Sequence, residues 1–212
     1  MPYAQIHYPF EGKAAFDQQF PANFIAEGLD QTRGWFYTLT VLSTALFDKP
    51  AFKNCVVNGL VLAEDGKKMS KRLKNYPDPS LIMEKYGADA LRLYLMQSPA
   101  VHGEELRFSE KYLVENMRAV LLPLWNSYQF FASYANIDGF HPSLWKNAPP
   151  VADRPQIDQW ILALLQETES KMHKEMESYE LANVFPLLAK FLDNLTNWYI
   201  RLNRSRFWES KG

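Results

Sequence analysis

The sequence predicts an α/β region that is followed by an all-α region. Two apolar runs, at residues 23–26 and 55–62, flank a stretch of helical periodicity, and this strand–helix–strand order is typical of a parallel βαβ unit. From about residue 109 onward, apolar residues recur only at helical spacing. The 212 residues, 47% of them hydrophobic, are enough to build a core for one or two domains.

The elements of the α/β region follow from its periodicity. Residues 1–22 hold three prolines and no sustained period, which indicates a loop with at most one short helix. A helix follows, with Asp30 placed to cap its N-terminus. The run from Cys55 to Leu62 is β-branched and nearly continuous, which predicts a strand buried on both faces. The predicted core face of the helix consists of Trp35, Leu39, Leu42 and Leu46.

A loop separates this region from the helices that follow. Residues 63–78 are polar and basic and contain a glycine, which predicts irregular structure. We expect two short helices at about 80–86 and 89–97. Gly87 between them is suited to end the first helix.

The all-α region is predicted to hold three long helices. A proline-containing linker at 137–155 follows the first, and the others begin near Ile157 and Leu181. Pro123 and Pro186 lie inside the first and third helices, where each removes an amide hydrogen bond, so we expect a bend or an interruption near each. The apolar stripe of the first helix consists of Leu113, Met117, Val120, Leu124, Tyr128, Phe131 and Ala135.

Composition excludes several classes of protein. The net charge is −1, so any contact with nucleic acid must come from a local basic patch. Cys55 is the only cysteine, which excludes an internal disulfide and a multi-cysteine zinc site, and the four histidines lack ligand spacing. We therefore predict no protein-bound metal. No stretch approaches 18 consecutive apolar residues and no secretory signal is recognisable, so we expect a cytoplasmic protein without a membrane partner.

The most informative stretch is residues 65–74, which hold five basic residues. Charge alone leaves two interpretations open: a solvated loop, including a nuclear-targeting cluster, or a phosphate-binding loop. Residues 68–72, Lys-Met-Ser-Lys-Arg, resemble the KMSKS motif of class I aminoacyl-tRNA synthetases, with arginine in place of the last serine. The resemblance implies that Lys68 and Lys71 stabilise the pyrophosphate that leaves ATP, and that Ser70 donates a hydrogen bond.

A second stretch, residues 27–37, combines a strand end, a polar turn and a helix start, a place that ligands favour in open α/β sheets. The alternative is a capped helix with aromatic core residues. The string Glu-Gly-Leu-Asp-Gln-Thr-Arg-Gly-Trp-Phe-Tyr resembles the isoleucine-specific members of that family, which implies an isoleucyl-adenylate site. Glu27 would contact the adenylate, and Trp35 would wall the isoleucine side-chain pocket. The other residues implied to line the adenylate are Gly28, Asp30 and Gln31.

A third stretch, residues 58–62, resembles the adenine platform of the family. Gly59 would let the purine approach the backbone closely, and Leu60 and Val61 would complete the ATP-binding strand. Without the resemblance, the pattern predicts only a hydrophobic strand.

The resemblance extends over nearly the whole chain. It implies that residues 1–62 are the second half of a Rossmann-like catalytic domain and that residues 63–108 hold the KMSKS loop and a stem-contact region. Residues 109–212 would be a truncated anticodon-binding helical domain. Three arginines are expected to track tRNA phosphate, although a solvated helix end explains them equally well. They are Arg201, Arg204 and Arg206.

The function implied is the activation of L-isoleucine with ATP and Mg²⁺ and its transfer to tRNA(Ile). Nothing in the chain matches the HIGH motif of the family, so we expect a fragment that lacks the N-terminal part of the same polypeptide and is inactive alone. One alternative is a catalytically incomplete tRNA-binding module that retains the loop and the helix bundle. Another is an unrelated helical interaction protein, but the joint presence of residues 27–37 and 65–74 disfavours it.

Overall fold

The computed structural model describes residues 2–70, 72–141, 143, 146 and 148–208. The chain divides into two compact units. The first, here called the sheet unit, comprises residues 1–76 and 98–108. The second, the helical unit, comprises residues 77–97 and 109–212. The α/β region followed by all-α structure that the sequence predicts is confirmed.

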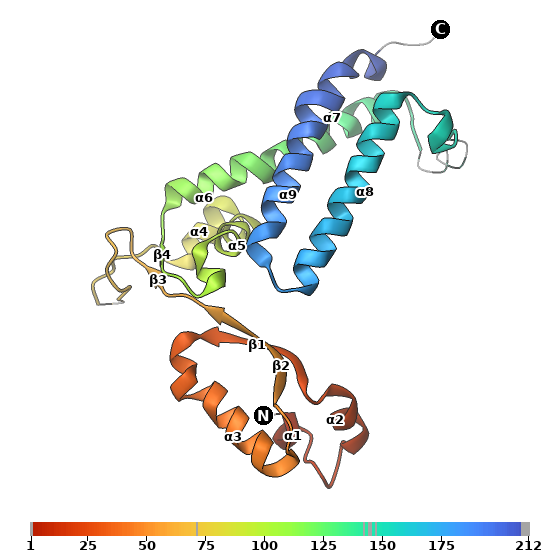
Figure 1. The fold of residues 1–212 in the computed structure, drawn as a ribbon. Coiled ribbons are helices and arrows are strands. Elements are labelled where there is room, and N and C mark those ends of the chain that lie inside the picture. The colour runs from red at the N-terminus through yellow and green to blue at the C-terminus, as the bar shows by residue number, and fades with distance from the viewer. Residues whose placement is uncertain (1, 71, 142, 144–145, 147, 209–212) are drawn as a thin grey trace. The chain divides into compact units, whose positions relative to one another are not determined.

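The sheet unit is built around two parallel strands, with a helix packed beside them (Figure 1). Its elements are α1 (Pro2–Gln5), α2 (Lys13–Gln19), β1 (Ala22–Gly28), a 3₁₀ helix (Leu29–Arg33), α3 (Trp35–Phe47), β2 (Phe52–Asn58), β3 (Val61–Leu62), a second 3₁₀ helix (Pro99–His102) and β4 (Leu106–Arg107).

The predicted βαβ unit is confirmed. Strands β1 and β2 pair in parallel from Ala22↔Phe52 to Gly28↔Asn58, and α3 connects them. The core beneath the strands is made by apolar side chains from all three elements, which bury the face of the sheet that α3 covers. Its buried members are Ile25, Phe36, Leu39 and Ala51.

The predicted core face of α3 is partly wrong. Trp35 and Leu46 are 40% and 61% exposed, whereas Phe36 and Ser43 are buried with Leu39. Ser43 occupies a core position because its hydroxyl donates to the Lys49 carbonyl at 2.7 Å, which satisfies the buried polar group. Because serine is not an apolar residue, the apolar pattern of the sequence did not reveal that Ser43 is buried.

Three further expectations for the sheet unit are wrong. Residues 2–21 contain two short helices, α1 and α2, where one was expected within a loop. The single strand expected over 55–62 is broken, because β2 ends at Asn58 and β3 begins at Val61. Cys55 is exposed, so β2 is not buried on both faces.

The helical unit contains the two short helices and the three long helical stretches that the sequence predicts. Figure 1 shows α8 and α9 side by side and antiparallel. Its elements are α4 (Pro79–Tyr86), α5 (Ala88–Met96), α6 (Glu110–Asn116), a π-helical segment (Met117–Leu121), α7 (Leu122–Ile137), a 3₁₀ helix (Val151–Asp153), α8 (Gln156–Glu177), α9 (Leu181–Asp193), a second π-helical segment (Asn194–Ile200) and a 3₁₀ helix (Arg204–Phe207).

The first helical stretch changes its hydrogen bonding where the proline was expected to disturb it. Residues Met117–Leu121 are π-helical, and the Leu122 amide donates to the Met117 carbonyl, five residues back. The π-helical segment ends two residues before Pro123, which lacks an amide hydrogen. The interruption expected at Pro186 does not occur, because α9 continues through it from Leu181 to Asp193. The other expected effect, a bend at Pro186, stays a prediction.

The apolar stripe predicted for this stretch is correct as far as Val120, inside the π-helical segment, and only in part beyond it. Leu113 and Val120 are 0% and 2% exposed, but Tyr128 and Phe131 are 61% and 43% exposed. A π-helical segment has more residues per turn than an α-helix, so a stripe extrapolated across it at α-helical spacing loses its phase. Beyond it, the half-buried positions include Pro123, Ser127, Phe130 and Tyr134.

Candidate functional site

The two strings that the sequence singled out begin at the same edge of the parallel sheet. Residues 27–37 start at the carboxyl end of β1, and residues 58–62 start at the carboxyl end of β2. The register pairs Gly28 with Asn58 and Glu27 with Val57, so the two strings leave adjacent strands side by side. The carboxyl edge of a parallel sheet is where open α/β folds bind ligands.

The polar residues after β1 form a connected group. The Gln31 side chain donates to the Asp30 carboxylate at 3.2 Å, and its carbonyl oxygen accepts the Trp35 amide at 2.8 Å. A Cβ added at Gly28 would lie 2.7 Å from Asp30 Oδ1, so the carboxylate folds back over the end of β1. These contacts hold Gly28, Asp30 and Gln31 at one place.

This geometry corrects the expected cap of α3. The chain first makes a 3₁₀ turn over Leu29–Arg33, so Asp30 does not reach the start of α3. Gln31 supplies the acceptor for the Trp35 amide instead. A Cβ at Gly34 would lie 2.9 Å from Gln31 Oε1, so a glycine there leaves room for this cap.

Glu27 and Trp35 flank the polar group. Glu27 is the last residue of β1 but one and is exposed. The Trp35 ring is 40% exposed, with its centroid 6.0 Å from that of Phe36. Both side chains are therefore accessible in this chain, on either side of the Asp30–Gln31 pair in sequence.

The short segment after β2 is held from one side by residues 98–108. The Gly59 amide donates to the Ala100 carbonyl at 2.7 Å, and the Leu106 amide donates to the Leu60 carbonyl at 2.8 Å. Strands β3 and β4 pair in parallel over two residues. A Cβ at Gly59 would lie 1.6 Å from the Glu104 carbonyl oxygen, so this backbone packs directly on the glycine. Packing therefore requires Gly59 whether or not a purine approaches it.

The root of the lysine loop is a tight turn. The Ala63 amide donates to the Lys67 carbonyl at 2.9 Å, and Leu62 forms an antiparallel bridge with Lys68. Asp65 Oδ1 accepts the Lys67 amide at 3.0 Å, while Lys67 Nζ lies 3.1 Å from Asp65 Oδ2. The pKa of Asp65 is lowered, chiefly because its carboxylate accepts the Lys67 backbone and side-chain hydrogen bonds.

The tip of the loop is closed by a single amide side chain. Asn75 Oδ1 accepts the Ser70 amide at 2.9 Å, and Asn75 Nδ2 donates to the Lys68 carbonyl at 3.2 Å. The Ser70 carbonyl in turn accepts the amides of Leu73 and Lys74, at 3.1 and 2.9 Å. Lys71, which the sequence assigns to catalysis, lies outside the described residues.

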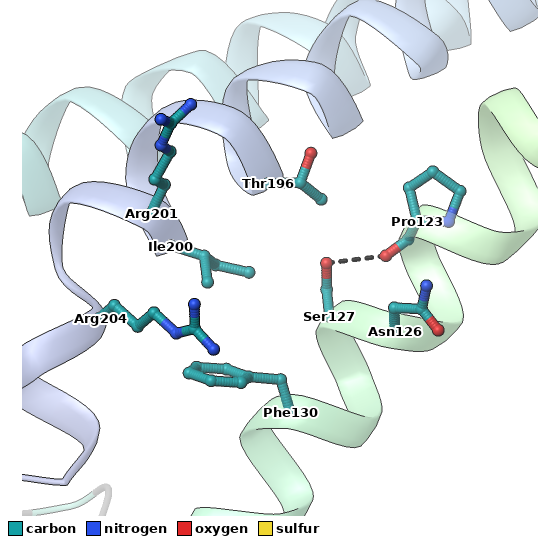
Figure 2. Close-up of a pocket in the computed structure, with 8 residues that line it drawn as sticks. All are labelled: Pro123, Asn126, Ser127, Phe130, Thr196, Ile200, Arg201 and Arg204. Atoms are coloured by element: carbon teal, nitrogen blue, oxygen red, sulfur yellow. Dashed lines mark hydrogen bonds between the residues drawn. The ribbon is translucent and has the colours of Figure 1, made fainter.

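The predicted tRNA-contacting arginines separate into two kinds. Arg201 and Arg204 line an open cleft of about 480 Å³ between α7 and the last helical stretch (Figure 2). The Arg204 guanidinium lies 6.0 Å from the Phe130 ring centroid and 5.5 Å from that of Trp208. Cationic groups beside aromatic faces in an accessible cleft suit an anionic, aromatic ligand. The remaining lining residues are Pro123, Asn126, Ser127, Thr196 and Ile200.

Arg206 has a partner inside the helical unit. Its guanidinium makes two bonds to the Asp158 carboxylate, at 2.7 and 2.9 Å, and Tyr199 donates to the same carboxylate at 2.9 Å. Asp158 is buried at 8% exposure. These contacts tie the start of α8 to the 3₁₀ helix Arg204–Phe207 and give Arg206 a partner within the helical unit, which neither expectation for this residue included.

The Asp158 pair makes stability depend on pH. Its bonds to Arg206 hold the pKa of the carboxyl below its ordinary value. A depressed carboxyl pKa stabilises the folded state at pH values above the unfolded pKa, about 3.9, and the contribution disappears as pH falls through the folded pKa.

We therefore expect Asp158→Asn to lower the free energy of unfolding by about 2 kcal/mol at pH 7, discounted because the Arg206 side chain is 48% exposed. The difference from the wild type should shrink below pH 4, as measured by urea unfolding at several pH values. Glu167→Gln, which disrupts an exposed pair with Lys171 on α8, serves as the control and should change stability little. A difference between wild type and Asp158→Asn that stays constant from pH 7 to pH 3 would contradict the assignment.

Two negative findings concern the described part of the chain. Within it, no group of three or more His, Cys, Asp or Glu side chains is placed to hold a metal ion. None of the helices within it is long and apolar enough to cross a membrane.

Sequence reasoning missed several residues of these sites. Asn75 lies within residues 63–108 but has no motif signal of its own, although an asparagine a few residues after a turn is a ready partner for backbone groups. Phe130 and Asp158 carried no recognisable signal, because their partners lie 74 and 48 residues away in the sequence. Strand β4 is two residues long, too short for any periodicity.

Two known families match parts of the chain. The family described as tRNA synthetases class I (I, L, M and V) matches residues 1–107, half of the chain. The family described as the anticodon-binding domain of tRNA ligase matches residues 158–212. The chain therefore belongs to the class I tRNA synthetases of the I, L, M and V group.

Its similar relatives are isoleucine–tRNA ligases. The protein of Protochlamydia amoebophila is 56% identical over 211 residues, which are 100% of this chain and 20% of that protein. The protein of Bdellovibrio bacteriovorus is 58% identical over 210 residues, 99% of this chain and 19% of that protein. The cytoplasmic mouse protein is 54% identical over 217 residues, 100% of this chain and 17% of its own length. The chain thus spans about a fifth of the length of these relatives.

Solved structures share the fold at low sequence identity. Methionyl-tRNA synthetase of Mycobacterium tuberculosis bound by methionyl-adenylate has a TM-score of 0.75 and 20% identity, covering 98% of this chain and 39% of that one. The ternary complex of Agrobacterium radiobacter LeuRS with tRNA and LeuAMS has a TM-score of 0.67 and 17% identity, covering 96% of this chain and 26% of that one. At these identities the likeness concerns the fold alone.

Proposed function

We propose that this chain supplies, within a longer isoleucine–tRNA ligase, the adenylate-binding edge and the leaving-group loop for the activation of L-isoleucine. The observation that carries the proposal is the parallel register that sets Gly28 beside Asn58. Residues 27–37 and 58–62 therefore begin at the carboxyl ends of two adjacent parallel strands, the edge at which open α/β folds bind ligands. The lysine loop follows the second string within a few residues.

The reaction assigns a task to each string. A carboxylate oxygen of isoleucine attacks the α-phosphorus of ATP, the new O–P bond forms, and the bond to the bridging oxygen breaks. The electron pair leaves with pyrophosphate, whose charge Lys68 and Lys71 offset. Glu27, Asp30 and Gln31 bind the polar parts of the adenylate. The 2′- or 3′-hydroxyl of tRNA(Ile) then attacks the carbonyl carbon and releases AMP.

ATP enters as its Mg²⁺ complex, which is substrate rather than a resident cofactor. Under the proposal, Gly59, Leu60 and Val61 lie along the adenine. The Cβ direction of Gly59 is filled by the Glu104 backbone, so the purine must approach from another side of the segment. The division into residues 1–62, 63–108 and 109–212 and a cytoplasmic location belong to the same proposal.

The test is isoleucine-dependent exchange of pyrophosphate into ATP by the full-length protein that contains this chain. We expect exchange that requires isoleucine and is followed by charging of tRNA(Ile). A full-length protein that binds tRNA but catalyses no exchange would instead support the alternative of a tRNA-binding module.

The choice of amino acid gives a second prediction. Trp35 is accessible at the start of α3, next to the proposed adenylate group. If its indole walls the side-chain pocket, Trp35→Ala should reduce the preference for isoleucine over valine through lost packing area. The preference of the wild type for isoleucine over valine is limited, because one methylene group changes binding by only about 1–3 kcal/mol. That magnitude is itself known from isoleucine–tRNA ligase.

The measurement is the ratio of isoleucine- to valine-dependent exchange in the full-length protein. Leu46→Ala, on the same helix but at its far end and 61% exposed, is the matched control. Equal ratios for wild type and Trp35→Ala would show that the indole does not contact the substrate.

The cleft of the helical unit carries the prediction about tRNA. Arg204 lines the cleft, while Arg206 is bound to Asp158, so the two arginines should behave differently. Arg204→Glu should weaken tRNA binding and reduce the dependence of affinity on salt by about one counterion. Filter binding at several salt concentrations measures both quantities. Unchanged affinity and salt dependence would favour a solvated helix end.

A further inference from the structure

We propose that Asn75 is a positioning residue that holds the lysine loop in its working shape. The inference rests on the proposed function of that loop. Asn75 is half-buried, and its amide bonds the backbone on both sides of Met69, accepting from Ser70 and donating to Lys68. Its side chain is a short crosslink across the motif.

The crosslink acts on the part of the loop that has no strand partner. Leu62 and the turn over Ala63–Lys67 fix the root of the loop up to Lys68. Beyond Lys68, the backbone turns through Met69 and Ser70, and the Ser70 carbonyl accepts two amides from the returning chain. Asn75 bonds the backbone of Lys68 and Ser70, so its side chain ties the returning chain to the start of this turn.

The consequence concerns the placement of charge. The lysines of the motif act only if their ammonium groups lie where charge develops on pyrophosphate, and a misplacement of about 1 Å can cost about 100-fold in rate. Lys74 has a φ of +46°, so the chain that returns from the turn contains a left-handed backbone conformation, which residues with a side chain rarely adopt. The amide of Asn75 holds the chain in that conformation from the next position.

The experiment compares three variants of the full-length protein. Asn75→Ala removes both bonds, whereas Asn75→Asp keeps an acceptor for the Ser70 amide. Asn54→Ala is the matched control, because Asn54 also bonds one backbone carbonyl, that of Asn23 at 2.9 Å, but in the sheet. Two readouts are taken: single-turnover formation of isoleucyl-adenylate with isoleucine affinity, and the rate of tryptic cleavage within residues 67–74.

For Asn75→Ala we expect adenylate formation to slow about 10-fold or more, with isoleucine affinity unchanged within about twofold. Tryptic cleavage of the loop should accelerate about fivefold or more, because two backbone bonds are lost. Asn75→Asp should recover part of the protection, and Asn54→Ala should match the wild type in both readouts.

The outcomes separate this inference from the function on which it rests. A wild type without isoleucine-dependent adenylate formation overturns the proposed function, and the cleavage rates then decide alone whether Asn75 holds the loop. An active wild type with Asn75→Ala equal to Asn54→Ala in both readouts overturns the positioning role. Equal losses in isoleucine affinity and adenylate formation, with new cleavage sites throughout the chain, show a general folding defect and overturn it as well.

Discussion

Gly59→Ala is expected to unfold or severely distort the sheet unit. The new methyl group would lie 1.6 Å from the Glu104 carbonyl oxygen and 2.5 Å from the carbonyl carbon, both backbone atoms. Because no side chain can move aside, the segment 98–108 must separate from the segment after β2. Overpacking in a core costs about 1–3 kcal/mol, and a clash with backbone at this distance belongs at or above the upper end.

The measurement is the free energy of unfolding of the chain, with hydrogen exchange of the amides that brace this segment. We expect a loss of about 3 kcal/mol or more, and faster exchange at Gly59, Leu106 and Phe108, whose amides bond across the two segments. Gly139→Ala is the control for backbone strain alone. Gly139 has a φ of +62° and open space around its Cβ, so this change should cost only about 1–2 kcal/mol.

A loss at Gly59→Ala no greater than that at Gly139→Ala would show that segment 98–108 is loosely held. The glycine would then be explained only by the approach of a ligand. The expected result instead assigns the glycine to packing, because the Glu104 backbone already occupies the space that a side chain needs.

The fold of the sheet unit was predictable where the spacing of apolar residues changes clearly from one element to the next. The strand at β1, the helix α3 and the strand at β2 follow from a change of period, and the parallel pairing of the two strands follows from the order of the three elements. The break between Asn58 and Val61 was not predictable, because the apolar run continues through it. From Gly59 onward the backbone bonds to residues 98–108 instead of to β1, and nothing in the local sequence indicates this change of partner.

The helical unit shows where periodicity stops being informative. The predicted stripe is buried at Leu113 and Val120. The π-helical segment Met117–Leu121 then changes which residues of α7 face the core, and no rule of composition predicts such a segment. Pro186 signals an interruption that does not occur. It lies in the second turn of α9, where the helix loses only the bond that an amide at this position would donate to the Ala182 carbonyl.

The sequence singled out residues for the candidate site, but it could not predict the contacts between them. The strings around Glu27 and Lys68 were identified from their order in the sequence. The hydrogen bonds that join Asp30, Gln31 and the Trp35 amide depend on a 3₁₀ turn that propensity does not specify. The same holds for Asn75, whose two hydrogen bonds form only because the loop brings its side chain back to the backbone of Lys68 and Ser70.

The lysines of the loop should differ sharply from one another although they carry the same charge. Lys67 is paired with Asp65 at the root of the loop, 3.1 Å apart. Lys68 follows it directly, and its carbonyl accepts a hydrogen bond from the Asn75 side chain. Under the proposed function, only Lys68 and Lys71 meet the charge that develops on pyrophosphate.

We expect Lys68→Ala and Lys71→Ala to lower the rate of adenylate formation about 10²–10³-fold in the full-length protein, the loss typical for one group that stabilises transition-state charge. Isoleucine affinity should stay within about twofold of the wild type, because the amino acid binds before charge develops. Lys67→Ala removes the same charge one position earlier and should cost less than about threefold, since its pair with Asp65 is exposed.

Single-turnover adenylate formation and equilibrium dialysis of isoleucine measure the two quantities separately. If Lys67→Ala and Lys68→Ala slow the reaction equally, the loop acts through its overall charge, and the position of each lysine in the motif does not determine its contribution to the rate. If Lys68→Ala weakens isoleucine binding as much as it slows the reaction, the residue supports the fold of the site. The proposed chemistry requires the third pattern, in which the rate falls, the affinity holds and the neighbouring lysine is dispensable.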